Sequence, residues 1–456
     1  RSTTGNDSFV SDAQTSVTFT AGEHAALSAE ALRAVTTDPG FQDFVTRASL
    51  LMERALSVNV DVMMSSSDQD FQMVDKTGEK LRLRATYFDE KWSKSKPVTS
   101  LHFHPQQPEF FLAGHTARAD GGLQSSKYAG SCVLVYSIHL PQRAAYTYQC
   151  QANVAKAMYC KYRPHMIVGS TFSGQIVLWD TRSGPHPVMQ SPLSAEAHTH
   201  AVFGLQVVGS PNSHSLISLS TDGRFCVWNL ENFSQPQECI DLCQLVDVGE
   251  SRVKKDITAS TLAFAEQEQN KFFVGSEDGG LYLGTRHSSA SHITEKFEGH
   301  VGPITATHCH PNSGGGGDFE DLVLTCSMDW SCKLWSHRRS RDRMYSRCLF
   351  SFDEYQEYVS DVQWSPVQPA VFASVDGRGE LQLWHLGQTM EVPISKLDIT
   401  GGIAANRLVW TPDGRGVITG DIKGNIQMCD VASDISIPEH ADWDKLSARL
   451  ADLTNS

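Results

Sequence analysis

Short runs in which apolar and polar residues alternate dominate this chain. Continuous apolar runs also occur: Met166–Val168 and Ile176–Leu178 flank a Ser173-Gly174 turn, and the second run closes on Trp179-Asp180. Strand-like runs on either side of a tight glycine turn are typical of a β-hairpin. The same order of an apolar strand, a second strand, a Gly or Asp turn and a third strand recurs along most of the chain.

The third strands allow the repeats to be counted. They end near seven residues that are 43 to 56 positions apart: Tyr136, Trp179, Trp228, Gly284, Trp335, Trp384 and Cys429. A period of about 40–45 residues with Trp-Asp at a strand end is typical of WD repeats, and loop insertions lengthen the spacing. The pattern therefore predicts an all-β fold, a seven-bladed WD-repeat β-propeller over residues 81–437.

The last repeat offers only three strands, near 407–410, 416–421 and 426–431. An open ring would leave strand edges unpaired. The alternating run Leu81–Tyr87 precedes the first repeat, so we expect it to supply the outer closing strand of the last blade.

The residues before the propeller divide into three predicted segments. Residues 1–26 are rich in Ser, Thr, Gly and Asp and are expected to be disordered alone, although Ser16–Thr20 could pair with a partner's sheet edge. Residues 27–60 contain a short predicted helix at 28–36 and a longer one that opens at Asp38-Pro39. Residues 61–80 are a mostly polar linker.

The longer helix has an apolar stripe at helical spacing: Phe41, Phe44, Val45, Ala48, Met52, Ala55 and Leu56. A polar linker separates it from the repeats, so a partner is favoured over the propeller itself as its binding surface. Residues 438–456 are predicted to be a helical tail with one apolar face, formed by Trp443, Leu446, Leu450 and Leu453.

Composition limits the classes of function. The net charge is −14, so there is no surplus of Lys and Arg for general nucleic-acid binding. No run of about 18 apolar residues could span a membrane, and no early run resembles a signal peptide. Because the first residue is Arg1, we expect the natural protein to begin upstream. The 11 scattered cysteines are typical of reduced thiols in a cytosolic protein.

Two repeats carry a His four residues before Val202 or Ile304 and an Asp six residues before a Trp. The two sets are His198, Asp222 and Trp228, and then His300, Asp329 and Trp335. We interpret both sets as buried hydrogen-bond networks that hold a blade together. A catalytic His–Asp pair is the weaker alternative, because an active site would not recur in two blades.

Other chemistry is also disfavoured. The His102-x-His104 and His198-x-His200 pairs and His308-Cys309-His310 have no third or fourth ligand at a recognisable spacing. No phosphate loop, G-x-S-x-G elbow or zincin pattern occurs. The sequence therefore predicts no enzyme activity, no catalytic residue, no metal and no cofactor.

Several runs resemble the dynein intermediate chain family, the WD-repeat subunits of the microtubule motor. They are Phe88–Lys94 (FDEKWSK), Ser170–Ser183 (STFSGQIVLWDTRS), Pro192–Val202 (PLSAEAHTHAV), Val274–Gly279 (VGSEDG), Phe297–Thr305 (FEGHVGPIT) and Asp361–Gly377 (DVQWSPVQPAVFASVDG). The likeness covers about residues 27–450. A general WD pattern would not include FDEKWSK before the first blade.

The resemblance implies an N-terminal region that collects light chains and a propeller that docks on the heavy chain. Ser11–Thr15 is similar to the motif for the hub-type light chain, which implies that Asp12, Gln14 and Thr15 contact it, with Ala13 in place of the motif's first Thr. Residues 28–56 resemble the segment for the roadblock-type light chain dimer, which implies contacts from Leu32, Val35, Phe41, Phe44, Val45, Ala48, Met52 and Leu56. The family's dynactin-binding helix would lie upstream of this chain.

The expected function is thus that of a non-catalytic intermediate chain in a cytoplasmic, microtubule-associated dynein that moves toward microtubule minus ends. Overall likeness favours the cytoplasmic complex over an axonemal arm. Two other classes stay open. One is a WD-repeat scaffold of another complex, such as a ubiquitin ligase or a vesicle coat. The other is a propeller enzyme, which needs a pocket with convergent polar groups.

Overall fold

The structure is a computed structural model. It describes residue 33 and residues 35–57, 79–117, 130–194, 197–248, 251–265, 269–287, 292–311, 319, 321–339 and 344–455. The predicted segment 1–26 and nearly all of the predicted linker 61–80 lie outside these residues. The chain divides into two compact units, residues 1–56 and residues 57–456.

The first unit contains the helix α2 (Pro39–Ser57). Proline suits the first helical position because its missing N–H has no intrahelical acceptor there. The chain enters the helix through two contacts, since the Gln42 backbone N–H donates to the Asp38 carbonyl at 3.1 Å and the Gln42 amide donates to the Thr36 carbonyl at 3.0 Å. Of the predicted helix at 28–36, residues 33, 35 and 36 are described and helical.

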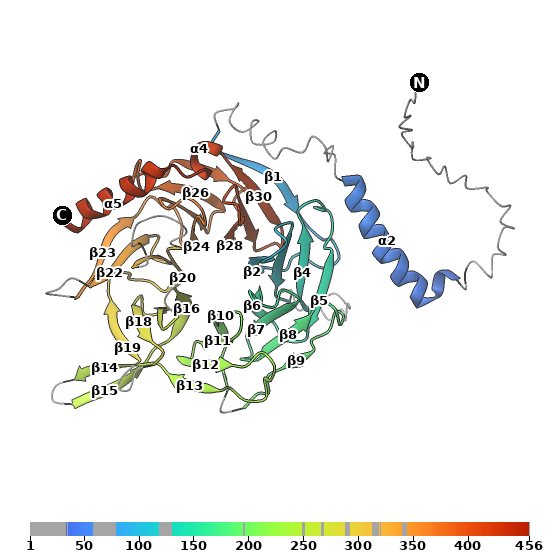
Figure 1. Cartoon of the computed structure of the whole chain (residues 1–456), viewed down its shortest axis with the longest axis horizontal. Helices are drawn as coiled ribbons and strands as arrows, with labels where there is room; N and C mark the ends of the chain where they lie inside the picture. Colours follow the sequence, from blue (N-terminus) through green and yellow to red (C-terminus); the bar gives the residue numbers. More distant parts are fainter. Residues whose placement is uncertain are drawn as a thin grey trace, which may run out of the picture. The chain divides into compact units, whose positions relative to one another are not determined.

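The second unit is a ring of four-stranded antiparallel sheets, which are numbered here as blades 1 to 7 (Figure 1). Blade 1 consists of β2 (Val98–Phe103), β3 (Phe110–His115), β4 (Ser131–Ser137) and β5 (Tyr146–Cys150). Blade 2 consists of β6 (Val154–Tyr159), β7 (Met166–Thr171), β8 (Ile176–Asp180) and β9 (Met189–Gln190). Blade 3 consists of β10 (Val202–Gly209), β11 (His214–Ser220), β12 (Arg224–Trp228) and β13 (Glu238–Asp241).

The other blades follow in chain order. Blade 4 consists of β16 (Ala259–Phe264), β17 (Lys271–Ser276), β18 (Leu281–Thr285) and β19 (Ile293–Phe297), and blade 5 of β20 (Ile304–Cys309), β21 (Leu322–Ser327), β22 (Cys332–Arg339) and β23 (Met344–Phe352). Blade 6 consists of β24 (Val359–Trp364), β25 (Val371–Asp376), β26 (Glu380–His385) and β27 (Ser395–Asp398). Blade 7 consists of β28 (Ala405–Trp410), β29 (Gly416–Asp421), β30 (Ile426–Val431) and β1 (Leu81–Tyr87). The predicted seven-bladed propeller is confirmed, and each residue used to count the repeats lies on the third strand of its blade.

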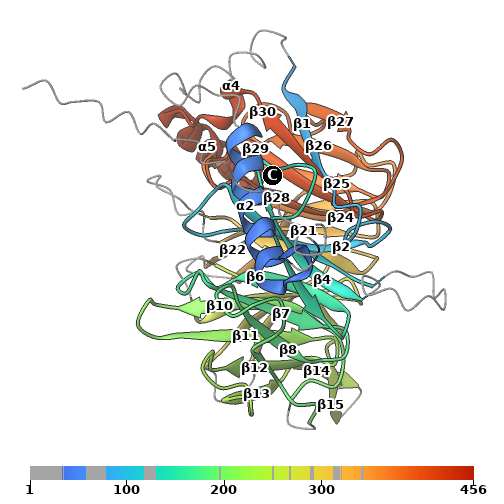
Figure 2. The ribbon, with the colours of Figure 1, turned by 90° about the vertical axis from the view of Figure 1, so that its right-hand side faces the viewer.

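The last blade is completed by the strand that comes first in the propeller. β1 pairs antiparallel with β30, with Leu81 opposite Val431 and Tyr87 opposite Ile426. Both views show β1 beside β30 (Figure 1, Figure 2). The Tyr87 hydroxyl donates to the Ile138 carbonyl of blade 1 at 2.9 Å. The outer edge of blade 7 is thereby paired, and the blade is joined to its neighbour.

The segment between β1 and β2 contains the FDEKWSK run. The Asp89 carboxylate accepts the backbone N–H groups of Lys91 at 3.0 Å and Trp92 at 3.1 Å. Its other oxygen accepts the N–H of Ala144, in the loop between β4 and β5, at 3.2 Å. Asp89 is buried. This run therefore fastens the start of the propeller to blade 1.

A series of hydrogen bonds links the inner strands of neighbouring blades. A polar side chain at the second position of an inner strand donates to the first carbonyl of the next inner strand. The pairs are Thr99 to Val154 (3.2 Å), Ser260 to Ile304 (2.6 Å), Thr305 to Val359 (2.6 Å), Ser360 to Ala405, and Asn406 to Val98 (3.2 Å). Because each of these donors spans two blades, they hold the ring closed.

The core lies between the faces of adjacent blades. Trp179, Trp228, Trp335, Trp364 and Trp384 are its largest buried side chains. Between blades 5 and 6, the rings of Phe372 and Trp384 stack with centroids 5.9 Å apart, and Phe352 packs edge-on against Trp384 at 5.0 Å. Such aromatic pairs add to the stabilisation from the buried area itself.

Two features lie outside the blades. The hairpin of β14 (Cys243–Val248) and β15 (Ser251–Asp256) is inserted between blades 3 and 4. At the other end, the short helix α4 (Ser433–Ser436) precedes α5 (His440–Asn455). Leu446 of α5 is fully buried in the core of blades 5 and 6, and Gln368 donates to the Asp442 carboxylate at 2.8 Å. The tail helix therefore packs onto the propeller. Among the described residues, no helix has the length and apolar character needed to cross a membrane.

Candidate functional site

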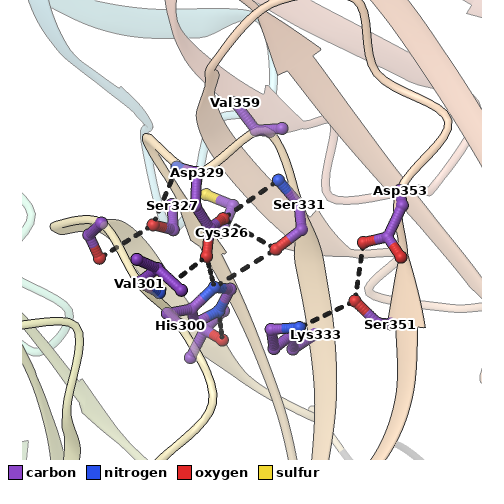
Figure 3. Close-up of polar contacts among 12 residues, drawn as sticks. His300, Val301, Cys326, Ser327, Asp329, Ser331, Lys333, Ser351, Asp353 and Val359 are labelled. Atoms are coloured by element: carbon purple, nitrogen blue, oxygen red, sulfur yellow. Dashed lines mark hydrogen bonds and ion pairs between the residues drawn. The ribbon is translucent and has the colours of Figure 1, made fainter.

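The His300 network lies in blade 5, on the loop between β19 and β20 and the turn between β21 and β22. His300 Nδ1 lies 2.9 Å from Asp329 Oδ2, and His300 Nε2 lies 2.8 Å from Thr325 Oγ1. Trp335 Nε1 donates to the same Thr325 oxygen at 2.7 Å. Figure 3 shows the His300, Asp329 and Ser331 side chains converging at this turn. Each buried polar group here has a partner, which fits a structural network better than a reactive one.

Asp329 is the centre of this network. Besides His300, its carboxylate accepts the Val301 backbone N–H at 3.1 Å and both the N–H and the hydroxyl of Ser331, at 3.1 and 2.7 Å. Burial opposes ionisation of Asp329, but the hydrogen bonds from His300 and Ser331 outweigh it and hold the pKa well below its usual range. The carboxylate therefore stays ionised and fixes the turn.

The corresponding network in blade 3 differs from that of blade 5 in the groups that donate to its aspartate. His198 Nε2 lies 2.6 Å from Ser218 Oγ, and Trp228 Nε1 donates to the same oxygen at 2.8 Å. His198 Nδ1, however, is buried without a hydrogen-bond partner in the described part of the chain. Asp222 instead accepts the Arg224 backbone N–H at 3.0 Å and the Thr199 hydroxyl at 3.3 Å. The expected full set with Asp222 is therefore wrong in this detail, because the neighbouring hydroxyl competes for the carboxylate.

The turn between the second and third strands also has a constant backbone feature. In five blades its third residue is a glycine with positive φ: Gly174 (91°), Gly223 (78°), Gly279 (79°), Gly379 (85°) and Gly424 (92°). A Cβ at Gly279 would meet the His300 carbonyl at 2.6 Å, so the backbone leaves no room for one. In blade 5 the same place is occupied by Trp330, with φ of 66°. A bulky residue rarely adopts this left-handed conformation.

Trp330 lies in an exposed apolar patch. Its own exposed fraction is 51%, that of Met328 on the same turn is 53%, and that of Val301 is 92%. The turn and the loop are in contact, because a Cβ added at Gly302 would lie 3.0 Å from the Asp329 backbone nitrogen. These three residues, Val301, Met328 and Trp330, are called the Trp330 patch below. A patch of this kind is a candidate surface for a partner protein.

Sequence reasoning did not find the Trp330 patch, although a signal was available. Aligning the third strands places SMDWS of blade 5 beside STDGR of blade 3, so that Trp330 falls opposite Gly223. Only a comparison of the repeats position by position identifies this exchange.

A cavity of about 400 Å³ lies among the inner strands of all seven blades. Lys156, Asp361 and Arg407 line it. Asp361 accepts the backbone N–H groups of Val362 and Leu408, both at 2.9 Å, and Arg407 Nε donates to the Thr99 carbonyl at 2.9 Å. Asp361 and Arg407 thus join inner strands of adjacent blades.

This cavity is the pocket that an enzyme would need. Its cysteine, Cys309, is disfavoured as a nucleophile because burial raises the thiol pKa to about 12. Burial also lowers the pKa of His102 and His308 to about 4, so both are neutral near pH 7. His308 Nδ1 accepts the Trp364 backbone N–H at 3.4 Å. Within the described chain, no group of three or more potential ligands could hold a metal ion.

The residues expected to contact light chains fall partly outside the structure. Asp12, Gln14, Thr15 and Leu32 lie outside the described residues, as does the side chain of Leu56. Phe44 and Met52 of α2 have exposed fractions of 65% and 66%. Val35, Phe41 and Val45 are also exposed, and Ala48 is half-buried. The stripe on α2 therefore presents two phenylalanine rings to solvent.

Comparison with known proteins first defines a class. Residues 291–336 match the family described as "WD domain, G-beta repeat". Together with the seven blades, this match makes the chain a WD-repeat β-propeller protein.

One curated relative is more specific. The chain is 37% identical over 432 residues to "Cytoplasmic dynein 1 intermediate chain" of Drosophila melanogaster. The match covers 94% of this chain and 62% of the relative, so the chain spans about three fifths of that protein's length. The resemblance to dynein intermediate chains is thereby confirmed.

Proposed function

We propose that this chain is a non-catalytic intermediate chain of a dynein motor that moves toward microtubule minus ends. The observation that carries the proposal is the 37% identity to a cytoplasmic dynein 1 intermediate chain along 94% of the chain. Force and ATP hydrolysis would belong to the heavy chain, while this subunit joins heavy and light chains. The same similarity supports a non-enzymatic role, a cytoplasmic, microtubule-associated location and a dynactin contact upstream of this chain.

The propeller is proposed to dock on the heavy chain through loops and one rim of the ring. Closed blades with paired outer strands form a rigid support for such loops. Affinity purification of the tagged full chain, with identification of the subunits that accompany it, tests the whole proposal. Recovery of a cytoplasmic dynein heavy chain is expected. Recovery of axonemal, ubiquitin-ligase or coat subunits without that heavy chain would replace the proposal with one of those assignments.

Helix α2 is proposed to dock on the roadblock-type light chain dimer by its apolar stripe. Each large apolar side chain gains about 1.5–3 kcal/mol on full burial, and Phe44 and Met52 are both mostly exposed. Helix-in-groove binding concentrates its energy in such anchors. The stripe thus has the chemistry that a hydrophobic groove requires.

Phe44→Asp should therefore abolish binding of the roadblock-type light chain and leave the melting of the propeller unchanged. Thr46→Asp is the matched control, because residue 46 is exposed on the other side of the helix and receives the same charge. Binding would be measured by titration with the purified dimer. If Phe44→Asp still binds the dimer and unfolds the propeller, then α2 is a cap on the propeller and this assignment is wrong.

Residues 12–20 are proposed to bind the hub-type light chain as an added strand. Backbone pairing would supply affinity, and Gln14 and Thr15 would supply specificity. A peptide spanning residues 8–20 should bind this light chain in a direct titration, and Gln14→Ala should weaken it. Absence of binding by the unaltered peptide would remove the assignment.

A further inference from the structure

The Trp330 turn keeps a conformation that its own residue disfavours. Five blades have glycine at this place, while blade 5 has a tryptophan with φ of 66°. Strain of this kind persists only where the surroundings enforce it, and it gathers at functional sites. The surroundings are the Asp329 hydrogen bonds to His300, Val301 and Ser331, which fix the turn on both sides of Trp330. The network therefore holds the backbone of the Trp330 turn in this conformation.

The fold itself gains little from the indole. Trp330 is about half exposed, whereas Trp335 on the following strand is buried in the core. Five other blades form the same turn with glycine. We propose that the Trp330 patch (Val301, Met328 and Trp330) is a docking surface on which the heavy chain places a segment with an apolar anchor flanked by Lys or Arg. This inference rests on the proposed function, and it adds a place and a chemistry to the contact.

The charges around the patch specify the flanks of the occupant. At each of the five glycine turns, the turn lies against the loop that leads to the next blade; Gly279, for example, lies against His300. The corresponding loop beside Trp330 is 353–358, and it carries the exposed residues Glu354 and Glu357. On the other side, Glu277 is exposed on the turn of blade 4. In the described part of the chain, none of these three carboxylates forms an ion pair, and the three are called the acidic rim below. Two cations reach the same loop through other atoms: Lys396 Nζ donates to the Glu354 backbone carbonyl at 3.3 Å, and Arg378 donates to the Gln356 side-chain oxygen.

An apolar centre with an acidic rim favours one type of partner. An exposed indole at the centre of a contact gives a large, stiff apolar area, and tryptophan is enriched among the residues that dominate binding energy. Lys or Arg of the partner would pair with the acidic rim, and one of them can also lie over the indole face. An acidic segment would meet repulsion at Glu354 and Glu357. Charge complementarity thus selects a basic, apolar-anchored segment.

The key variant is Trp330→Gly, because glycine suits the left-handed turn and removes the indole. We expect its melting temperature to equal or exceed that of the wild type, and its retention of the heavy chain to fall at least tenfold. Binding would be measured with the tagged full chain and purified heavy chain at graded NaCl concentrations. Val392→Ser is the control: Val392 is half exposed in blade 6, in the loop between β26 and β27, which lies at the other end of the strands from the turn between second and third strands.

Two more variants keep the test decisive. Val301→Gln replaces an apolar side chain that is 92% exposed with a neutral polar one, so it leaves both the core and the charge of the patch unchanged, and it should also weaken retention. Glu354→Lys combined with Glu357→Lys should weaken retention and flatten its dependence on salt.

The outcomes separate this inference from the function on which it rests. If the wild-type chain retains no heavy chain, the proposed function fails. If the wild type retains it and both Trp330→Gly and Val301→Gln do so equally well, the Trp330 patch is not the docking surface, and the proposed function stands. A large drop in the melting temperature of Trp330→Gly would show that the indole serves the fold and would overturn the argument from strain.

Discussion

Removal of the Asp329 carboxylate is the sharpest test of the His300 network. Asp329→Ala takes away the acceptor of His300 Nδ1 at 2.9 Å and of the Ser331 hydroxyl at 2.7 Å. The His300 side chain is completely buried, so water cannot replace the lost acceptor. The matched variant is Asp222→Ala in blade 3, where His198 Nδ1 already has no partner in the described part of the chain.

The two variants should differ in their free energy of unfolding. A buried donor that loses its acceptor costs about 1–3 kcal/mol, so two such donors predict a loss of about 2–6 kcal/mol for Asp329→Ala. Asp222 accepts one backbone N–H at 3.0 Å and one hydroxyl near the surface, which predicts about 1 kcal/mol for Asp222→Ala. Urea unfolding of the full chain, followed by tryptophan fluorescence, gives both values on one scale. Equal losses would refute the assignment of the network to His300 and Asp329.

The contribution of Asp329 to the free energy of unfolding should also depend on pH. The pKa of Asp329 is held below its usual range in the folded chain, while an unfolded aspartate titrates near about 3.9. The contribution of Asp329 is therefore complete above about pH 4 and is lost as the pH falls through the folded pKa. The stability difference between the wild type and Asp329→Ala should shrink in acid. A difference that stays constant down to pH 2.5 would contradict the assignment.

Three further predictions concern the propeller. Burial lowers the pKa of Lys156 to about 8, below the usual value of about 10.4. The buried charge therefore destabilises the fold fully below about pH 8, and this cost falls as the pH rises to about 10. Lys156→Met should thus raise the stability against urea at about pH 7, and by less at about pH 10. Leu446→Ala should lower the free energy of unfolding in urea by about 2–5 kcal/mol, whereas the exposed Arg449→Ala should lower it by less than about 0.5 kcal/mol. Equally small losses would contradict the packing of α5 on blades 5 and 6. Tyr87→Phe should lose about 1 kcal/mol through the bond to Ile138, and an unchanged midpoint would contradict that closure.

The architecture was predictable because a propeller repeats one local pattern. The period of the third strands and the missing strand of the last repeat can both be read from alternation alone. The lone run Leu81–Tyr87 has the length and the alternation that the open edge needs, and it pairs with β30. The apolar face of the tail helix was visible at Trp443 and Leu446, but its receptor in the core of blades 5 and 6 was not, because that surface forms only when two repeats meet.

Contacts that depend on competition between neighbours were not predictable. His198 and His300 each lie four residues before an inner strand, and Asp222 and Asp329 each lie six residues before a tryptophan. Only His300, however, lies within hydrogen-bond distance of its aspartate; Asp222 accepts from Thr199 instead. The hydroxyl of Thr199 stands where blade 5 has Val301, which offers only its backbone N–H to Asp329. The turns differ as well, because Ser331 donates its hydroxyl to Asp329 at 2.7 Å where blade 3 has Arg224. Motif spacing identifies the candidates for a network, whereas the neighbouring side chains determine which bonds form.

Residues that depart from the repeat pattern can indicate function, because the requirements of the fold do not explain them. A position filled by glycine in five turns defines what the fold requires there, namely a backbone with positive φ and no side chain against the next loop. A tryptophan at the sixth such position is therefore not explained by the fold, since the fold is satisfied without it. Holding a non-glycine residue in this region costs about 1–2 kcal/mol, which must be offset by the surrounding hydrogen bonds. The Asp329 network is more complete than its counterpart in blade 3, and it surrounds this residue. The stronger network and the strained, exposed indole therefore belong to one arrangement, in which local stability holds a binding residue in place.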